Sequence, residues 1–194
     1  MVTKSQRCKK YLKEVFDLND NFKTDGSQFD HLFSDGEEFM IGSLKAGAIH
    51  TPGHTPADMV CVIDGILFTG DTLLAPDSGT ARCDFPGGSA QTMYDSVRNI
   101  LETLPLETEM YVCHDYPKEK DRELLYKTTV AEQRQNNIHV RDGVSKNEFV
   151  KLRSERDKAL DLSSYIFPAV QINGNAGSTV PGEFIKLSYN NKVL

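Results

Sequence analysis

Three side chains, those of His54, Asp71 and His114, are suited by type and position to binding a metal ion. His54 follows a Pro-Gly turn, Asp71 follows the apolar segment ILFTG, and His114 follows the short apolar segment EMYVC. Loops at the ends of strands are where binding and catalytic sites are commonly built. Imidazole and carboxylate groups bind zinc and non-haem iron, and two histidines with one carboxylate are typical of iron oxygenases. The sequence therefore predicts a metal site here, against the alternative that each histidine is a surface or packed residue.

The sequence predicts a β region on either side of His54. LKAGAIHT has the pattern of a strand, and the segments MVCVI and ILFTG flank Asp64-Gly65, which is the strongest hairpin signal in the chain. A second hairpin is predicted around Asp35-Gly36, and EMYVC is predicted to be a short strand.

Helices are predicted at the N-terminus and in the second half of the chain. Hairpins followed by helices predict an α+β or layered α/β architecture. Ser89 is placed as an N-cap, and Ser145 with Glu148 forms a capping-box signature. The tail from Phe167 is rich in turn-forming residues. The predicted helices span residues 4–18, 89–104, 119–136 and 145–160.

The composition is that of a mildly acidic globular domain. The 194 residues carry a formal net charge of −6, which argues against binding nucleic acid through its phosphates. No apolar run approaches the roughly 20 residues that cross a bilayer, so no membrane partner is expected. Four widely spaced cysteines without a CxxC pair, and an N-terminus without a secretory pattern, predict a reducing compartment, either the cytoplasm or the mitochondrial matrix.

Consecutive motifs connect these residues to a known family. HTPGHTPAD, LFTGDTLL, GTARCDFPGG and YVCHDY resemble motifs of the metallo-β-lactamase superfamily, and its persulfide dioxygenase branch in particular. The resemblance extends over nearly the whole chain. It implies an αββα sandwich, a single non-haem Fe(2+), with Zn(2+) as the alternative, and the oxidation of glutathione persulfide by dioxygen to sulfite and glutathione. By this resemblance His54 and Asp71 are two of three iron ligands, and His114 matches the second-metal position of two-metal hydrolases.

One motif of the family does not occur in the sequence. The HxHxDH pattern supplies the third iron ligand, and the remaining histidines, His31, His50 and His139, lack its neighbours. We therefore expect a single domain over residues 1–194 that is incomplete at its N-terminus, a partial sandwich lacking its N-terminal strands. Such a loss exposes a sheet edge and apolar surface, which favour association with another chain, for example as a homodimer. The alternative is that His114 completes the ligand set.

Residues beside these motifs have a functional and a structural interpretation. Arg82 is the candidate for holding an anionic substrate, because a guanidinium binds a carboxylate through two hydrogen bonds, and its alternative is a salt bridge with Asp84. Cys83 is interpreted as a packed residue rather than a reactive thiol. Tyr116 is the candidate for donating its hydroxyl to a bound thiol or dioxygen species, with half-buried packing as the alternative.

The residues that follow His54 allow two interpretations. Thr55 and Asp58 either orient the imidazole or belong to a turn or a helix start, with Thr55 as its cap and Pro56 at its first position. The turn or helix start is the preferred interpretation.

Three functional hypotheses remain open. The first is a persulfide dioxygenase that acts on glutathione persulfide or another glutathione-derived small molecule and needs the HxHxDH segment from elsewhere. The second is a metal-dependent thioester hydrolase similar to glyoxalase II, and the motifs around GTARCDFPGG argue against it. The third is an inactive relative that serves as a binding or dimerisation module. Metal content and oxygen uptake discriminate among them.

Overall fold

A computed structural model of the chain contains two compact units, which are described separately. One comprises residues 33–159, and the other combines residues 1–32 with residues 160–194. Most of the helix predicted over residues 4–18 lies outside the described residues. The single domain over the whole chain stays a prediction. The structure describes residues 10, 13, 14, 23–117, 122–161, 166–174, 176 and 177.

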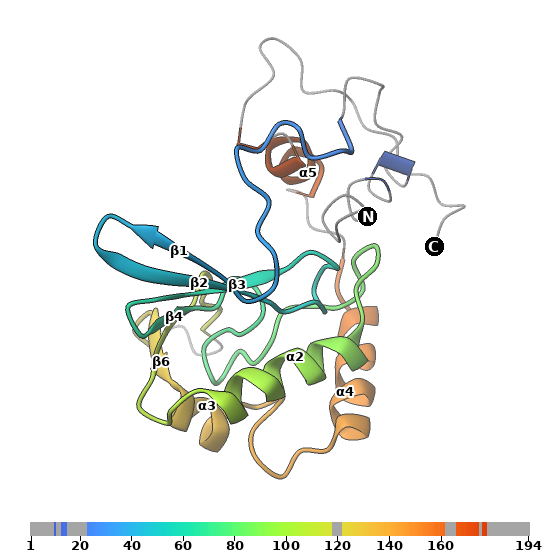
Figure 1. Cartoon of the computed structure of the whole chain (residues 1–194). Helices are drawn as coiled ribbons and strands as arrows, with labels where there is room; N and C mark the ends of the chain where they lie inside the picture. Colours follow the sequence, from blue (N-terminus) through green and yellow to red (C-terminus); the bar gives the residue numbers. More distant parts are fainter. Residues whose placement is uncertain are drawn as a thin grey trace. The chain divides into compact units, whose positions relative to one another are not determined.

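The described residues of the larger unit form a six-stranded sheet with helices on one side (Figure 1). This arrangement confirms the predicted α+β class. The sheet order follows the chain order: β1 (Glu37–Ile41), β2 (Leu44–His50), β3 (Met59–Ile63), β4 (Ile66–Phe68), β5 (Glu109–Tyr111) and β6 (Lys127–Thr129). The helices of this unit are α2 (Ala90–Thr103), α3 (Val130–Asn136) and α4 (Lys146–Lys158). Neighbouring strands are antiparallel except for β4 and β5, which run parallel.

The hairpin predicted at Asp64-Gly65 is confirmed. It joins β3 to β4, and both turn residues have positive φ, 50° at Asp64 and 82° at Gly65. Two-residue hairpin turns need positive φ at both positions, and Asp-Gly adopts such backbone with little strain.

The hairpin predicted around Asp35-Gly36 is wrong. β1 begins after this pair and turns into β2 through Gly42, whose φ is 61°. Asp35 instead accepts a hydrogen bond at 2.8 Å from the backbone N–H of His50, at the end of β2. Two turn signals flank EEFMI, and the hairpin forms at Gly42, the turn that has a strand on each side.

The helix termini follow their capping residues. The Ser89 side chain accepts from Thr92 N at the start of α2, and the capping box of Ser145 and Glu148 is present at the start of α4. The helix predicted over residues 119–136 is wrong for its described first part, because Lys127–Thr129 is a strand and α3 begins only at Val130. Thr129 is the N-cap of α3, and this explains why the chain passes directly from strand to helix at this residue.

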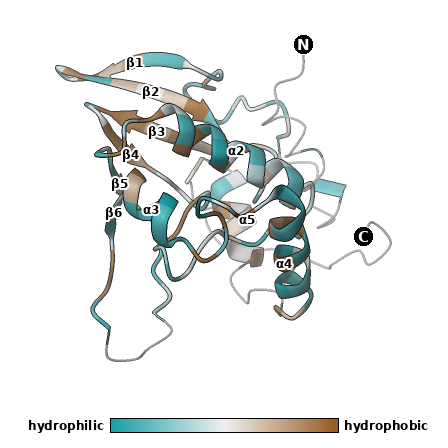
Figure 2. Ribbon diagram, turned by 90° about the horizontal axis from the view of Figure 1, so that it is seen from below, coloured by the Kyte–Doolittle hydropathy of each residue, from teal (hydrophilic) through white to brown (hydrophobic). Residues whose placement is uncertain are grey.

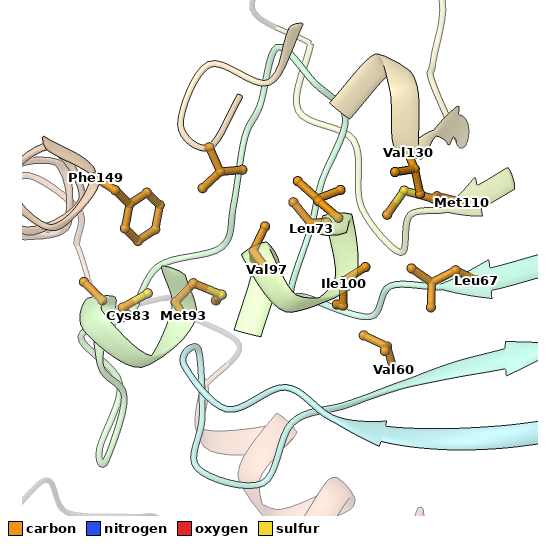
Figure 3. Packing of buried hydrophobic residues seen from close by; sticks show 13 residues of the cluster. Val60, Leu67, Leu73, Cys83, Met93, Val97, Ile100, Met110, Val130 and Phe149 are labelled. Atoms are coloured by element: carbon orange, nitrogen blue, oxygen red, sulfur yellow. The ribbon is translucent and has the colours of Figure 1, made fainter. Parts of the chain in front are cut away.

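The core lies between the sheet and the helices (Figure 3). Side chains from α2 meet side chains from the sheet, and Phe149 joins them from α4. All the residues of this cluster are at most 8% exposed. The labelled core residues are Val60, Leu67, Leu73, Cys83, Met93, Val97, Ile100, Met110, Val130 and Phe149.

The opposite face of the sheet is also apolar. Leu67 and Met110 point into the core, so the alternation of side chains along a strand places Phe68 and Tyr111 on the other face. Their rings stack with centroids 5.7 Å apart, and Tyr126 follows at 6.3 Å from Tyr111. Figure 2 shows apolar residues along β2, β3 and β4. Association of two copies through a sheet edge, β1 or β6, stays a prediction.

In the smaller unit, Ile166–Gly174 forms helix α5, so the prediction of a turn-rich tail is wrong for these residues. Among the helices that the structure describes, none combines the length and apolar character needed to cross a membrane.

A buried ion pair fastens α4 to the loop at residues 80–83. Arg153 and Asp157 lie one turn apart and are 2% and 5% exposed, and their charged groups are 2.7 Å apart. Arg153 also donates to the carbonyl of Thr80 at 3.0 Å, and Asp157 accepts from the backbone N–H of Cys83 at 2.9 Å. The pair therefore holds both ends of this loop.

Arg153→Met should lower the free energy of unfolding by about 3–5 kcal/mol, because it leaves the Asp157 carboxylate buried without its partner. Urea denaturation measures the change. Lys45→Met, which removes the well-exposed ion pair of Lys45 with Glu38, is the matched control and should change it by less than about 1 kcal/mol. Equal losses in the two variants would contradict a special role for the buried pair.

Candidate metal centre

Asp71 and His114 are close together because each lies in the loop that follows one of two neighbouring parallel strands. β4 and β5 are paired with Phe68 opposite Tyr111, and Asp71 and His114 each lie three positions further along the chain. Loops that follow neighbouring parallel strands begin side by side, at the C-terminal ends of both strands. The sequence identified both residues but not the parallel pairing that joins them.

Buried threonines connect the loop of Asp71 to the two neighbouring loops. Thr69 donates its backbone N–H to the carbonyl of Tyr111 at 3.0 Å, which ties it to the end of β5. The hydroxyls of Thr72 and Thr51 are 2.9 Å apart, which ties the other side of Asp71 to the loop that follows β2. All three threonines are at most 1% exposed. Threonine is common in strands and turns, so the sequence carried no signal for this role.

His54 is positioned by a close approach of its loop to helix α2. A side chain at Gly53 would place its Cβ 2.5 Å from the Cα of Met93, so only glycine fits there. The backbone carbonyl of Gly53 accepts from the N–H of Ser89, the N-cap of α2. The loop carrying His54 is therefore fixed against the start of this helix.

The imidazole of His54 has a defined tautomer. Its Nδ1 lies 2.7 Å from the carbonyl oxygen of Arg82, and a carbonyl can only accept, so Nδ1 carries the proton. In the neutral imidazole Nε2 then presents a lone pair, and this atom lies 3.9 Å from Oδ2 of Asp71. A backbone carbonyl on the second ring nitrogen is the common way in which a metal-binding histidine is oriented. The loop that supplies this carbonyl is the one held by Arg153 and Asp157.

Asp71 lies between the two histidines. Its Oδ2 faces His54, and its Oδ1 lies 3.6 Å from Nε2 of His114. Two donors held about 2.1 Å from one cation at tetrahedral angles are roughly 3.4 Å apart, so both separations are close to those of coordinating groups. The residue types and spacings of this cluster therefore fit a metal ion.

Cys113 is a member of the site that the sequence reasoning missed. Its Sγ lies 3.3 Å from Oδ1 of Asp71, and the donor atoms of Asp71, Cys113 and His114 all lie within 4.8 Å of one another. Burial, followed by the Asp71 carboxylate, raises the pKa of the Cys113 thiol to about 12. The signal in the sequence was its position next to His114 in the loop after β5.

Arg82 is paired within its own loop. Its Nε and Nη2 lie 2.5 Å and 2.6 Å from the two carboxylate oxygens of Asp84, and the guanidinium lies over the ring of Phe85, 5.0 Å from the centroid. The ring of Phe85 also contacts His54, with centroids 4.9 Å apart. The salt bridge considered from the sequence is present, and binding of an anionic substrate by Arg82 stays a prediction.

The segment after His54 forms a turn, which is one of the two structural forms expected for it. Thr55 donates to Asp58 through its backbone N–H at 2.7 Å and through its hydroxyl at 2.5 Å. Burial of the carboxyl raises the pKa of Asp58. The Nε2 of His50 lies 3.0 Å from the carbonyl oxygen of Pro56.

The two remaining candidates differ in exposure. Cys83 is 6% exposed and belongs to the core, and burial raises the pKa of its thiol to about 12, so the packed interpretation describes it. Tyr116 is 61% exposed, with its ring centroid 5.9 Å from that of His114. Its hydroxyl is therefore accessible beside the cluster.

The comparisons with known proteins agree with this geometry. The family model described as the metallo-beta-lactamase superfamily matches residues 7–114, which is more than half of the chain and includes His54, Asp71 and His114. The chain belongs to the metallo-beta-lactamase superfamily. Membership of this superfamily implies metal binding and does not show which metal is bound.

Several curated relatives are similar over most of the chain. Glyoxylase B2 of Dictyostelium discoideum is 49% identical over 93% of this chain and 61% of its own length. A probable metallo-hydrolase of Burkholderia pseudomallei is 45% identical over 84% of this chain and 58% of its own length. The mitochondrial persulfide dioxygenase ETHE1 of Homo sapiens is 34% identical over 80% of this chain and 58% of its own length. The chain thus spans about 60% of the length of these curated relatives.

A solved structure supports the superfamily assignment independently. ETHE1 from Myxococcus xanthus matches with a TM-score of 0.66 and 35% sequence identity, over 75% of this chain and 60% of that one.

Gly88→Ala should disturb the loop around His54. A Cβ at this position would lie 2.4 Å from the carbonyl oxygen of Cys83 and 2.9 Å from that of His54. We expect a loss of about 1–3 kcal/mol in the free energy of unfolding and shifted NMR resonances for the His54 imidazole. Gly47→Ala is the control, because its Cβ meets only one oxygen, at 4.0 Å. Unchanged His54 resonances in Gly88→Ala would show that the loop is not tightly packed.

Proposed function

We propose that this chain binds iron(II) through His54 and Asp71 and belongs to an enzyme that oxidises glutathione persulfide with dioxygen to sulfite and glutathione. The observation that carries the proposal is the approach of the His54 Nε2 lone pair to the Asp71 carboxylate at 3.9 Å, with the imidazole oriented by the Arg82 carbonyl. Similarity to the human persulfide dioxygenase supports the choice of reaction.

Each residue has a separate part in this proposal. His54 and Asp71 hold the metal, and iron at such a site supplies the activation of dioxygen when it is bound. Tyr116, with its accessible hydroxyl, donates a hydrogen bond to the persulfide sulfur. Arg82 binds a carboxylate of the glutathione moiety, in exchange for part of its ion pair with Asp84.

A metal-dependent thioester hydrolase is the second candidate function. The separation of 3.6 Å between His114 and Asp71 favours it, because a second cation at Asp71 would have an imidazole ligand there. The names of the relatives from Dictyostelium discoideum and Burkholderia pseudomallei point in the same direction. Hydrolysis of S-lactoylglutathione by the zinc-loaded chain, without oxygen uptake, would favour this function over the first.

The direct test measures bound iron and oxygen consumption with glutathione persulfide. With a segment that carries the HxHxDH motif supplied to the chain, we expect stoichiometric iron, and sulfite released in proportion to the oxygen consumed. His54→Ala and Asp71→Ala should each reduce both by on the order of 100-fold or more, beyond the effect of losing a residue that merely orients a ligand. His31→Ala, at an exposed histidine outside this cluster, should leave both unchanged. No bound iron and no oxygen consumption with that segment present would contradict the proposal.

Tyr116→Phe tests the proposed hydrogen bond to substrate. Removing the hydroxyl should lower kcat/KM for glutathione persulfide by about 3–10-fold, which corresponds to one hydrogen bond of about 0.5–1.5 kcal/mol. Iron content should not change. Tyr126→Phe is the matched control, because Tyr126 is similarly exposed, at 68%, and contacts Tyr111 rather than the metal cluster. The same loss in both variants would rule out a specific role for Tyr116.

A further inference from the structure

The loop at residues 80–83 begins against the imidazole of a buried histidine. His139, in the segment after α3, is 1% exposed, and its Nδ1 lies 2.9 Å from the backbone nitrogen of Thr80. A Cβ on Gly79 would collide with the same ring atom, so a larger residue there would displace the ring or the loop. The loop backbone and the imidazole are therefore in direct contact.

His139 is held in turn by a buried polar network at the end of α3. Its backbone N–H donates to Oδ1 of Asn137 at 2.8 Å. Asn137 is the C-cap of α3, and its Nδ2 donates to Oε1 of Gln133 at 2.6 Å. Both amide residues are 0% exposed, and buried polar groups that are paired specify one arrangement. The end of α3 therefore determines where the ring of His139 lies.

The contact with Thr80 determines which ring nitrogen of His139 carries the proton. A backbone N–H can only donate, so Nδ1 accepts and the proton of the neutral ring is on Nε2. The Thr80 hydroxyl is further from Nδ1, at 3.3 Å. Nε2 lies 2.9 Å from Nη1 of Arg156, which is also a donor, but Arg156 is exposed and can turn towards solvent. The buried amide of Thr80 has no such freedom, so its bond decides the tautomer.

We propose that His139 is a positioning residue for the imidazole of His54 and acts through the loop at residues 80–83. The carbonyl of Arg82, in this loop, accepts from Nδ1 of His54 at 2.7 Å and so determines which nitrogen of that ring is left to bind a metal. His139 fixes the loop two residues earlier, at the amide of Thr80. The inference deepens the proposed function and rests on it, because His54 is an iron ligand there.

Thr80 is held through both of its backbone polar groups. His139 accepts from its N–H, and Arg153 of α4 donates to its carbonyl at 3.0 Å. Thr80 is 2% exposed, and a buried amide without an acceptor is costly. Removing the acceptor on His139 should therefore make the loop move until the amide finds another partner. The Arg82 carbonyl moves with the loop, and His54 loses the bond that selects its tautomer.

Nitrogen-15 NMR of the metal-free chain, labelled at histidine, tests the inference at about pH 8, where free histidine is neutral. The shifts of the ring nitrogens report which of them carries the proton. We expect Nδ1–H for His54 in the wild-type chain. His139→Leu, which removes the acceptor with little change in volume, should shift His54 towards the tautomer mixture of free histidine. His139→Asn, whose Oδ1 can take the place of Nδ1, should retain the wild-type pattern.

Two further measurements separate positioning from general stability. Ile100→Ala is the control variant, because Ile100 is a core residue of α2 that is 1% exposed, so its loss should lower the Tm and keep the His54 pattern. The bond itself is measured in the wild-type chain, as a nitrogen–nitrogen coupling between the Thr80 amide and Nδ1 of His139. This coupling decides the question if His139→Leu does not fold.

Four results would overturn the inference: Nε2–H for His54 in the wild-type chain, an unchanged His54 pattern in folded His139→Leu, the same change in Ile100→Ala, or no coupling between Thr80 and His139. With the HxHxDH segment supplied, His139→Leu should also weaken iron binding by on the order of 10-fold. The tautomer is measured without iron. A chain that binds no iron while its His54 tautomer follows His139 would therefore contradict the proposed function and leave the positioning role supported.

Discussion

The two oxygens of the Asp71 carboxylate face different partners, and the site depends on this division. Oδ2 faces His54, which comes from the loop after β2, and Oδ1 faces Cys113 and His114, which come from the loop after β5. Three segments distant in the sequence therefore meet at one anionic group. A carboxylate in such a position is stabilised by a cation, and the surrounding donors are those that bind one.

The fold holds this carboxylate through buried hydroxyl and backbone groups rather than through charges. Thr69 and Thr72 flank Asp71 and bind the end of β5 and the loop after β2, respectively. Buried polar groups are costly unless they are paired, so these bonds specify one arrangement of the loops. The ion pair of Arg153 with Asp157 fixes the loop at residues 80–83. The carbonyl of Arg82 in this loop orients the imidazole of His54. Helix α4 thus influences the site without touching it.

The local signals in the sequence were the reliable ones. Asp64-Gly65 adopts the backbone that its turn requires, and the capping box of Ser145 and Glu148 begins α4. Each depends on a few adjacent residues, so long-range contacts cannot easily override it. Asp35-Gly36 carried the same type of signal, but Gly42 competed for the same strand and formed the hairpin instead.

What the sequence did not predict depends on pairing between distant segments. Cys113 lies within the motif YVCHDY but was not considered as a member of the site, and its closeness to Asp71 follows from the parallel alignment of β4 with β5. For Arg82 the sequence left two alternatives open, a salt bridge with Asp84 and the binding of an anionic substrate. Only the salt bridge could be read from the sequence, because Asp84 is two residues away in the chain, whereas a substrate is not part of the chain. Neither the threonine bonds nor the contact of Arg153 with Thr80 leaves a pattern that a single sequence reveals.

The most direct measurement of the central claim is anomalous diffraction at the zinc edge from crystals soaked in a zinc salt. The account predicts an anomalous peak about 2.0–2.2 Å from a carboxylate oxygen of Asp71, with donors from a neighbouring loop around it. A peak elsewhere on the chain, or none beside Asp71 at saturating zinc, would contradict the role given to this carboxylate.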